Sequence, residues 1–312
     1  MPELCVFHGK ALEAYAFPEP HPFAAPRLPA FWREFTARKL DAKTLIEPPE
    51  SCDEKLLLSF HAPDYIERVK ALSKRGEGVL DAGDTPAFPG VFEAASIVVG
   101  TTLKGVRLIM EGRARRAMNP IGGLHHARPD TAGGFCVFND IGVAVKLLRS
   151  RYGIQRIGYV DIDAHHGDGV YYPFEDDPDL VIGDMHEDGR FLYPGTGSAD
   201  ETGQGVAEGT KLNIPLMPDT GETGFITAFE RIERLMDQAK PEFFMFQCGA
   251  DSLADDPLAH LALTPRCHRY AAERVRKLAD KHAQGRLLAM GGGGYKLSNI
   301  AAAWCAVAEA LL

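Results

Sequence analysis

Short apolar segments recur along the whole chain, separated by longer segments whose apolar positions follow a helical spacing. Each short segment is hydrophobic at almost every position, which is typical of parallel strands that are buried on both faces of a sheet. The expected strands are Leu4–Phe7, Ala117–Pro120, Ile157–Ile162, Leu180–Gly183, Leu212–Leu216, Phe243–Cys248 and Leu287–Met290.

The longer segments predict amphipathic helices. One of them opens with Thr264-Pro265, where threonine suits the N-cap and proline suits the first helical position, whose N–H has no partner inside the helix. The expected helices are Pro29–Ala42, Ala62–Lys74, Val91–Met110, Asp140–Tyr152, Glu222–Gln238, Pro265–Ala283 and Leu297–Leu312.

This alternation of strand and helix predicts an α/β fold, with a central, mostly parallel sheet and helices on both of its faces. No linker, low-complexity tract or internal repeat interrupts the pattern. With 312 residues, of which 45% are hydrophobic, the chain is long enough to enclose a sizeable core. We therefore expect residues 1–312 to form a single domain.

The charge and the cysteines narrow the expected partners and location. The formal net charge is -9, and nucleic acids and anionic membranes attract basic surfaces, so we expect neither as a partner, whereas a cationic substrate is mildly favoured. No apolar run reaches the length of a membrane span, and Met1-Pro2-Glu3-Leu4 lacks the pattern of a secretory signal. The six cysteines are scattered without a Cys-x-x-Cys motif, which indicates reduced thiols in a cytoplasmic protein.

Polar motifs follow four of the expected strands, at the ends where open α/β sheets bind ligands. Asp163 and His165 follow one strand and Asp251 follows another, and we expect these three side chains to hold a metal ion. Three protein ligands leave a coordination position open for water, as in catalytic zinc sites. Two carboxylates and one imidazole suit Zn(II) and tolerate Fe(II) or Mn(II). The simpler alternative is that Asp163 and His165 cap a helix and fill a polar crevice.

His125 and His126 are adjacent, and we expect them to form an acid–base pair, because the ordinary pKa of histidine lies near neutrality. Each histidine needs a carboxylate to orient it, and Asp161 and Asp168 are the carboxylates not assigned to the metal. Tyr295 follows four glycines, which permit a close backbone approach and let the phenol donate to a developing oxyanion. A flexible turn is the alternative explanation for the glycines taken alone.

Other features near these motifs have simpler interpretations. Phe135, which follows Gly133-Gly134, can form an aromatic wall, although a phenylalanine after glycines is more often part of the core. We expect Cys136 and Cys248 to be buried thiols and not nucleophiles. We expect Asp255-Asp256 to be a solvated turn.

Four motifs together carry a resemblance to a known family. They are Gly-Gly-Leu-His-His at 122–126, Asp-Ile-Asp-Ala-His-His-Gly-Asp-Gly at 161–169, Gln-Cys-Gly-Ala-Asp-Ser-Leu at 247–253 and Gly-Gly-Gly-Gly-Tyr at 291–295. With these motifs the chain resembles the histone deacetylase superfamily, which includes acetoin-utilisation proteins and acetylpolyamine amidohydrolases. The resemblance runs from about His21 to Tyr295. It implies the arginase/deacetylase fold and zinc-dependent removal of an acetyl group, either from acetyl-lysine in a protein or from a small acetylated amine.

The resemblance also implies roles for the polar residues, position by position. The residues that match the zinc ligands are Asp163, His165 and Asp251. The tandem histidines of the family match His125 and His126, with Asp161 and Asp168 as their respective partners. In that mechanism His126 removes a proton from water, and either histidine can supply the proton that the departing amine needs.

Further positions match residues that contact the substrate. Tyr295 matches the tyrosine that polarises the acetyl carbonyl, and Phe135, with Gly134 beside it, matches an aromatic wall of the substrate tunnel. Asp84 matches an aspartate at the tunnel rim that holds the substrate backbone. Arg27 matches an arginine below the metal.

Two places depart from the family pattern. Asp184 and Met185 stand where many relatives have Ser-Leu near a bound potassium ion, which counts against a potassium site here or changes its charge. Leu192 and Tyr193 precede Pro194 where eukaryotic members often carry two aromatic residues. We therefore expect Tyr193 to contact the substrate as part of an altered second wall.

Two rival functions remain at this stage. A binuclear manganese ureohydrolase shares the fold but needs more bridging carboxylates, whereas Asp251 is followed by Ser252-Leu253, and it leaves Tyr295 without a role. A catalytically silent protein could keep the pocket for acetylated ligands, but it would have no reason to retain every catalytic group. The sequence leaves open both the identity of the acetylated substrate and the oligomeric state.

Overall fold

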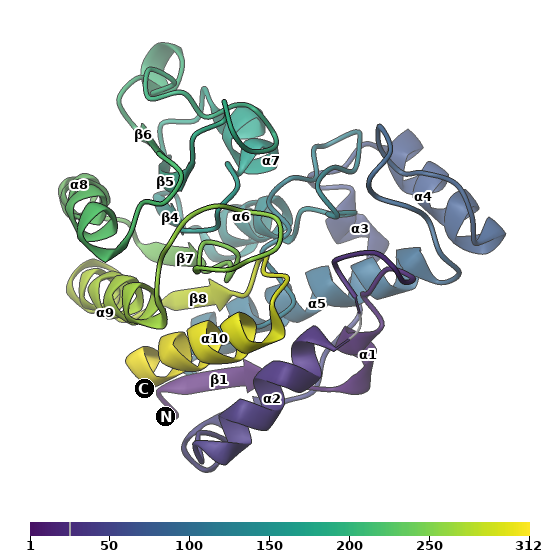
Figure 1. The fold of residues 1–312 in the computed structure, drawn as a ribbon, viewed down its shortest axis with the longest axis horizontal. Helices are drawn as coiled ribbons and strands as arrows, with labels where there is room; N and C mark the ends of the chain where they lie inside the picture. Colours follow the sequence, from purple (N-terminus) through teal and green to yellow (C-terminus); the bar gives the residue numbers. More distant parts are fainter. Residues whose placement is uncertain (25) are drawn as a thin grey trace.

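The computed structural model describes residues 1–24 and 26–312, and in this part of the chain the strands form one eight-stranded sheet (Figure 1). The strands are β1 (Leu4–Phe7), β2 (Leu45–Glu47), β3 (Arg116–Asn119), β4 (Ile157–Asp161), β5 (Leu180–Glu187), β6 (Lys211–Leu216), β7 (Phe243–Gln247) and β8 (Leu287–Met290). Their order in the sheet is β2-β1-β3-β8-β7-β4-β5-β6, and every pair is parallel.

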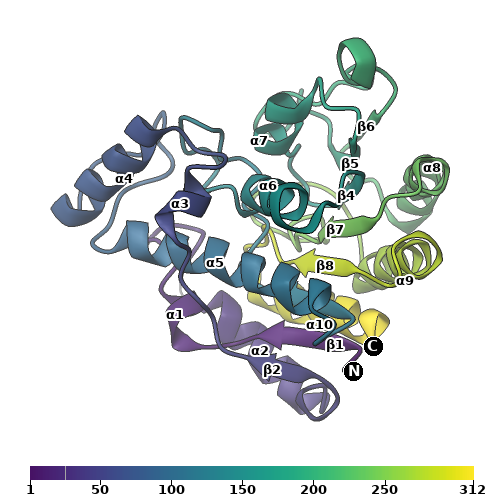
Figure 2. The ribbon, with the colours of Figure 1, turned by 180° about the vertical axis from the view of Figure 1, so that it is seen from behind.

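Helices cover both faces of this sheet. On one face lie α5 (Val91–Met110) and α6 (Asp140–Tyr152), which are in front in Figure 2. The opposite face, in front in Figure 1, is covered by α2 (Arg27–Ala37), α8 (Glu222–Ala239), α9 (Pro265–His282) and α10 (Leu297–Leu311). The remaining α-helices are α1 (Lys10–Glu13), α3 (Glu54–Leu57), α4 (Pro63–Arg75) and α7 (Asp168–Tyr171). The arrangement confirms the predicted α/β fold class.

Every expected strand is present, and the differences from the prediction have local causes. The structure adds β2 at the edge of the sheet, which is only partly buried and ends in Glu47, so it lacks the continuous apolar run of an inner strand. Strand β5 continues past the predicted end at Gly183 to Glu187. Its last four residues include Asp184 and His186, which can be buried because they bond to each other. A strand predicted from hydrophobic residues alone therefore ends too early.

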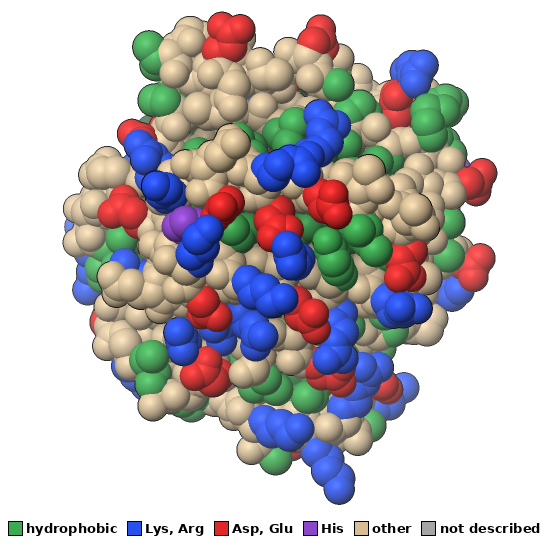
Figure 3. Space-filling model, turned by 90° about the vertical axis from the view of Figure 1, so that its left-hand side faces the viewer, with side chains coloured by type: hydrophobic (Ala, Val, Ile, Leu, Met, Phe, Trp, Pro, Cys, Tyr) green, Lys and Arg blue, Asp and Glu red, His purple; other side chains and the backbone are tan. Residues whose placement is uncertain are grey.

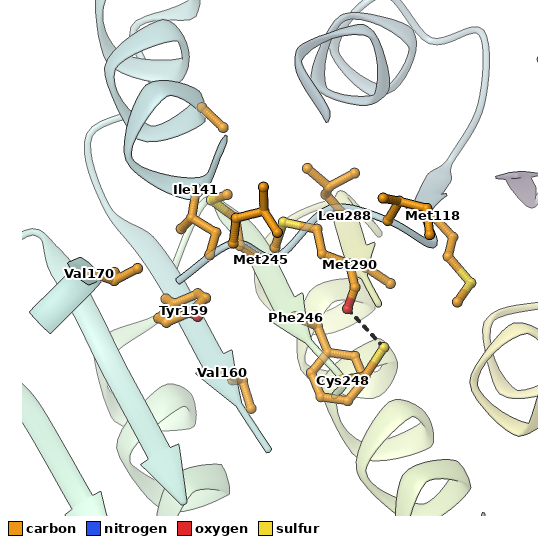
Figure 4. Close-up of a cluster of buried hydrophobic side chains, with 14 of the residues drawn as sticks. Met118, Ile141, Tyr159, Val160, Val170, Met245, Phe246, Cys248, Leu288 and Met290 are labelled. Atoms are coloured by element: carbon orange, nitrogen blue, oxygen red, sulfur yellow. Dashed lines mark hydrogen bonds between the residues drawn. The ribbon is translucent and has the colours of Figure 1, made fainter. Parts of the chain in front are cut away.

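Large apolar side chains fill the space between the sheet and its helices. Met118, Met245 and Leu288 come from three different strands and are fully buried (Figure 4). The thiol of Cys248 donates to the carbonyl oxygen of Met290 at 3.0 Å, which confirms that Cys248 is a buried thiol. Burial of apolar area on this scale is the main favourable contribution to folding.

The outer face of α8 and α9 carries charges of both signs (Figure 3). Arg274 Nε bonds to Glu233 Oε2 at 2.8 Å, and Lys281 Nζ lies 2.6 Å from Asp237 Oδ1, so these ion pairs connect the two helices. Exposed pairs of this kind contribute little individually. Within the described residues, no helix has both the length and the apolar character that crossing a bilayer requires.

Candidate metal centre and catalytic pocket

Four neighbouring strands deliver polar side chains to one edge of the sheet. Strands β3, β8, β7 and β4 are adjacent and parallel, so their carboxyl ends lie together. The loops that leave these ends carry residues 122–126 after β3, 162–168 after β4, 248–256 after β7 and 291–295 after β8. The four sequence motifs therefore meet at a single place, although they are far apart in the chain.

Asp163, His165 and Asp251 converge at this place. Each offers one ligand atom, and these atoms lie within 4.8 Å of one another. His165 Nδ1 is 3.0 Å from Asp163 Oδ1 and 3.2 Å from Asp251 Oδ2. Among residues 1–24 and 26–312, this is the one group of three His, Cys, Asp or Glu side chains that converges closely enough to hold a metal ion.

The ligand carboxylates are also fixed from outside the centre. Asp163 Oδ2 accepts hydrogen bonds from Gln247 Nε2 at 2.7 Å and from the N–H of Gly293 at 2.8 Å, and Asp251 Oδ1 accepts from the N–H of Ala164 at 2.9 Å. Outer partners of this kind orient metal ligands. Position 293 requires glycine, because a Cβ there would lie 2.0 Å from Asp251 Oδ2.

The charges in this cluster favour a bound cation. Burial and the neighbouring charge of Asp163 raise the pKa of Asp251 to about 7. A divalent cation between the two carboxylates would remove this repulsion, and two carboxylate oxygens with one imidazole nitrogen are a suitable donor set for it. The residues present therefore fit a divalent metal ion.

His125 lies between an aspartate and its neighbouring histidine. Its Nδ1 is 2.8 Å from Asp161 Oδ2, and its Nε2 is 3.1 Å from His126 Nε2. Asp161 also accepts from the hydroxyl of Tyr159 at 2.5 Å and from the N–H of Asp163 at 3.0 Å. Burial opposes the imidazolium form, but the charges of Asp161 and Asp163 outweigh it and raise the pKa of His125 to about 10.

His126 has a different environment. Its Nδ1 is 2.7 Å from Asp168 Oδ1, and Asp168 Oδ2 accepts from Arg128 Nη2 at 2.8 Å. Burial and the positive charge of His125 lower the pKa of His126 to about 4. The surroundings of the two adjacent histidines therefore shift their pKa values in opposite directions.

The phenol of Tyr295 faces the same cavity. Its ring centroid lies 5.8 Å from that of Phe135. Burial and the charge of Asp251 raise the pKa of Tyr295 well above its ordinary value, so the hydroxyl stays protonated and can donate a hydrogen bond. Below this loop, Arg27 Nε donates to the carbonyl oxygen of Gly294 at 3.0 Å.

A narrow cavity connects these groups. His126, Asp163, His165 and Tyr295 all line it, so the acid–base pair, the metal ligands and the phenol share one space. The thiol of Cys136 lines the cavity as well, and burial raises its pKa well above the ordinary value. Cys136 is therefore a buried, protonated thiol, as expected from the sequence.

Phe135 enters the site from a tight turn. Gly133 and Cys136 exchange two backbone hydrogen bonds, of 3.1 and 2.8 Å, and the residues between them, Gly134 and Phe135, have φ values of +50° and +68°. Two consecutive positive φ values are typical of a type I′ turn. Gly134 has a second constraint, because a Cβ there would lie 2.3 Å from Cδ2 of His126.

Two buried side chains hold this turn in place. The hydroxyl of Tyr15 donates to the carbonyl oxygen of Phe135 at 2.8 Å and accepts from the N–H of Val137 at 3.0 Å. The N–H of Phe135 donates to Thr85 Oγ1 at 3.1 Å. These bonds stabilise the left-handed backbone of a bulky residue, which is otherwise unfavourable.

Asp84 and Tyr193 lie at the mouth of the site. Together with Asp81 and Thr131 they line a surface hollow, and the ring centroid of Tyr193 is 5.1 Å from that of His126. Partial burial and the neighbouring carboxyl group of Asp81 raise the pKa of Asp84 to about 6. The mouth is therefore acidic near neutral pH, with an aromatic ring between it and the acid–base pair.

Asp184 stands where the chain departs from the family pattern near the potassium site. Its negative charge is balanced by neighbouring groups of the same chain. Its Oδ1 is 2.6 Å from His186 Nδ1, and its Oδ2 accepts from the N–H of Gly167 at 2.9 Å. Burial opposes the charge on His186, but Asp184 outweighs it and raises the pKa of His186. Both carboxylate oxygens of Asp184 are thus engaged within the chain.

Several residues that support the site could not be identified from the sequence. Tyr15, Thr85 and Arg128 stand in no motif, and their partners lie far away along the chain, so no local pattern could identify them. The prediction of a solvated turn was wrong for Asp256, which is 8% exposed and accepts a hydrogen bond from the N–H of Tyr295. The only hint in the sequence was that Asp256 lies five positions after the predicted metal ligand Asp251.

Comparisons with known proteins agree with this geometry. The sequence profile described as "Histone deacetylase domain" matches residues 21–311. The acetoin utilization protein AcuC of Bacillus subtilis (strain 168) is 36% identical over 302 residues, which cover 94% of this chain and 78% of that protein. The AcuC of Staphylococcus aureus (strain MRSA252) is 33% identical over 304 residues, covering 95% and 77%. The crystal structure of the HDA15 HD domain superposes with a TM-score of 0.91 at 27% identity, over 99% of this chain and 87% of that one.

Proposed function

The chain belongs to the histone deacetylase family, and on this premise we propose a zinc-dependent mechanism for its deacetylase activity. As a member of this family with AcuC relatives, it is a deacetylase hydrolase that acts on an acetylated substrate. The observation that carries the proposal is the convergence, in one cavity, of a metal-ligand triad, two histidine–aspartate pairs and a phenol. We infer that Asp163, His165 and Asp251 hold one Zn(II) ion, with Fe(II) as the alternative metal.

When bound by Asp163, His165 and Asp251, a metal ion would act as a Lewis acid, polarising an acyl oxygen and making water a better nucleophile. In this proposal His126 is the general base, because it is neutral, lines the cavity and is oriented by Asp168. His125 is held by Asp161 and lies beside His126, with 3.1 Å between their Nε2 atoms, so it is the second member of the acid–base pair. The proton then passes from this histidine pair to the departing amine, since an unprotonated amide nitrogen is a poor leaving group.

Tyr295 has the role of oxyanion donor. Tyr295 lines the cavity together with the histidines, and its protonated hydroxyl can donate to the acyl oxygen as that oxygen becomes negative. Phe135 and Tyr193 would form the walls around the substrate chain, with Gly134 leaving space for His126 between them. Asp84, exposed at the mouth, would hold the part of the substrate that stays outside.

We propose an acetylated amine as the substrate, either acetyl-lysine in a protein or a small acetylated amine. The narrow cavity and its aromatic walls suit a linear alkyl chain that ends in an acetamide. The carboxylates of Asp81 and Asp84 at the mouth, together with the net charge of -9, favour a substrate that carries positive charge. A potassium ion is not part of the proposal, because both carboxylate oxygens of Asp184 already have partners.

The rival functions fit the site less well. A binuclear ureohydrolase needs further bridging carboxylates, whereas the described residues contain one triad of converging ligands. It also gives Tyr295 no task. A silent binding protein has no need for two oriented histidine–aspartate pairs beside the metal ligands.

Deacetylase turnover of the zinc-loaded protein, measured on an acetyl-lysine peptide and on an acetylated polyamine in parallel, tests the proposal. We expect turnover on at least one of them, and a loss of about 100-fold or more in kcat for Tyr295→Phe, because one oxyanion donor is removed. Tyr65→Phe is the matched control, since it removes a buried hydroxyl that bonds to the carbonyl oxygen of Val137, outside the cavity. Zinc-loaded protein that turns over neither substrate, or a Tyr295→Phe variant that keeps full activity, contradicts the proposal.

A further inference from the structure

The loop that carries Tyr295 is fixed by a hydrogen bond at almost every residue. The N–H groups of Gly291 and Gly292 donate to the carbonyl oxygens of Asn119 and Gly122, at 3.1 and 2.8 Å. The N–H of Gly293 donates to the metal-ligand carboxylate of Asp163. A chain of glycines has no side chains of its own to hold it, so its position depends on these external partners.

At Tyr295 itself the partner is the carboxylate of Asp256. The N–H of Tyr295 donates to Asp256 Oδ2 at 2.9 Å, and the N–H of Leu258 donates to Asp256 Oδ1 at 3.0 Å. Neither partner is a charged side chain, and Asp256 is only 8% exposed, so its burial costs free energy that no ion pair offsets. A residue that merely closed the loop could be neutral.

The geometry explains why a carboxylate stands there. Both of its oxygens face backbone N–H groups, so position 256 must supply two acceptors. The amide of asparagine supplies one acceptor and places its NH2 group against the other N–H. An aspartate is thus the residue that can hold Leu258 and Tyr295 at the same time.

Other contacts join the same two loops but do not touch Tyr295. Lys296 Nζ lies 3.1 Å from Asp255 Oδ2 on the surface, and Asn299 Nδ2 donates to the carbonyl oxygen of Ala254 at 3.0 Å. Removing either contact controls for the general effect of loosening these segments. Asp255 lies beside Asp256 in the chain, and Asn299 lies one helical turn after Tyr295.

We propose that Asp256 is a positioning residue, which holds the backbone of Tyr295 so that its phenol stays aimed into the cavity beside the metal centre. This rests on the proposed function, because the phenol has a catalytic task only if Tyr295 is the oxyanion donor. Asp256 does not touch the substrate. It acts through Tyr295, and it links the loop of the phenol to the loop of the metal ligand Asp251.

Steady-state kinetics of Asp256→Asn, with Asp255→Asn and Asn299→Ala as controls, test the proposal. We expect kcat to fall by about 10-fold or more with KM within about 2-fold, because a misplaced catalytic group costs rate and not binding. The controls should keep kcat within about 2-fold. A kcat for Asp256→Asn equal to that of the controls overturns the proposal.

A double variant separates positioning from a general loss of structure. If Asp256 acts through the phenol, Asp256→Asn should lower kcat by less than about 2-fold when Tyr295→Phe is already present. Losses that multiply in full contradict the proposal. Should Asp256→Asn fail to fold, Asp256→Glu takes its place, because it keeps two acceptor oxygens but displaces them by one methylene, and the same pattern is expected.

Hydrogen–deuterium exchange of the peptide covering 291–299 decides the matter even without turnover. We expect its amides to exchange about 10-fold faster in Asp256→Asn than in the wild type, with no change in Asp255→Asn. Equal exchange in all three proteins overturns the role of Asp256. If the wild type has no deacetylase activity but Asp256→Asn exchanges faster, the proposed function fails while the positioning of Tyr295 by Asp256 stands.

Discussion

The two adjacent histidines show how single residues of one type acquire different roles. Asp161 and Asp163 surround His125 with negative charge, whereas His126 has one aspartate whose charge Arg128 already balances. The chain thus gives two neighbouring histidines pKa values that are shifted in opposite directions. The different pKa shifts of His125 and His126 therefore come from the carboxylates around them and not from the histidines themselves.

Replacing His126 tests this assignment. We expect His126→Ala to lower kcat by about 100-fold or more, because general-base catalysis is lost, while the zinc content of the protein stays unchanged. Steady-state kinetics with metal analysis of the same samples provide the measurement. His282→Ala, on α9, is the control and should keep full activity. A His126→Ala variant within about 5-fold of the wild type would remove His126 from the mechanism.

Residues that belong to short motifs could be identified from the sequence alone. Asp163, His165 and Asp251 were predicted as one group from their chemistry and from their place after strands, and the structure brings them together. Residues that act through a single long-range bond could not be found in this way. Asp256 is the clearest case, because an aspartate after another aspartate resembles a solvated turn until its partner is known.

At the scale of elements, loops do most of the positioning in this site. The turn around Phe135 combines two positive φ values with bonds from Tyr15 and Thr85, which lie about 120 and 50 residues away in the chain. The strands and long helices were predictable because their apolar patterns are periodic. The conformation of the turn around Phe135 could not be predicted, because the residues that stabilise it, Tyr15 and Thr85, come from distant segments. We call these two residues the clamp.

Tyr15→Phe tests whether this clamp shapes the substrate wall. The variant leaves the N–H of Val137 without its partner, so we expect the free energy of unfolding to fall by about 1–3 kcal/mol. We also expect KM to rise by about 3-fold or more with kcat within about 2-fold, because Phe135 loses a bond that holds its backbone.

Tyr65→Phe is the matched control for this clamp. The hydroxyl of Tyr65 donates to the carbonyl oxygen of Val137 at 2.6 Å, in the same segment, but makes no bond to Phe135. Its removal should lower stability and leave KM unchanged. An equal rise of KM in both variants, or in neither, contradicts a specific effect through Phe135.

At the scale of the whole molecule, the parallel sheet determines where the site lies. The chain builds both sides of the sheet, with β1–β3 and then β4–β6, and returns to its centre with β7 and β8, so four motifs that are distant in sequence share one end of it. That residues 1–312 form a single domain stays a prediction, and it leads us to expect one cooperative unfolding transition. The strand order could not be predicted, because all the inner strands have similar apolar sequences.

Buried neutral histidines should make the whole molecule sensitive to acid. Burial lowers the pKa of His61 to about 4, and its Nε2 accepts from the N–H of Asn139 at the start of α6. Since the pKa is lower in the folded than in the unfolded state, this histidine stabilises the fold above about pH 6.5 and loses that contribution as the pH falls toward 4. We therefore expect stability to decrease with pH across this window.

Urea denaturation of the wild type and of His61→Gln, at pH 7 and at pH 5, measures this contribution. The variant should be less stable at pH 7 because it loses a buried histidine, and the difference should shrink by about 2 kcal/mol at pH 5. Comparing the two proteins at each pH removes the contribution of the metal ligands, which titrate in both. A difference that is the same at both pH values contradicts this account.

We propose that one metal ion, held by Asp163, His165 and Asp251, supports deacetylation. The most direct test is to remove metal from the protein and to follow deacetylase turnover while zinc is added back in known amounts. We predict no turnover without metal and a linear recovery that ends at one zinc ion per chain, with no recovery in Asp251→Asn. Full turnover in metal-free protein, or a recovery that ends at two ions per chain, would contradict it.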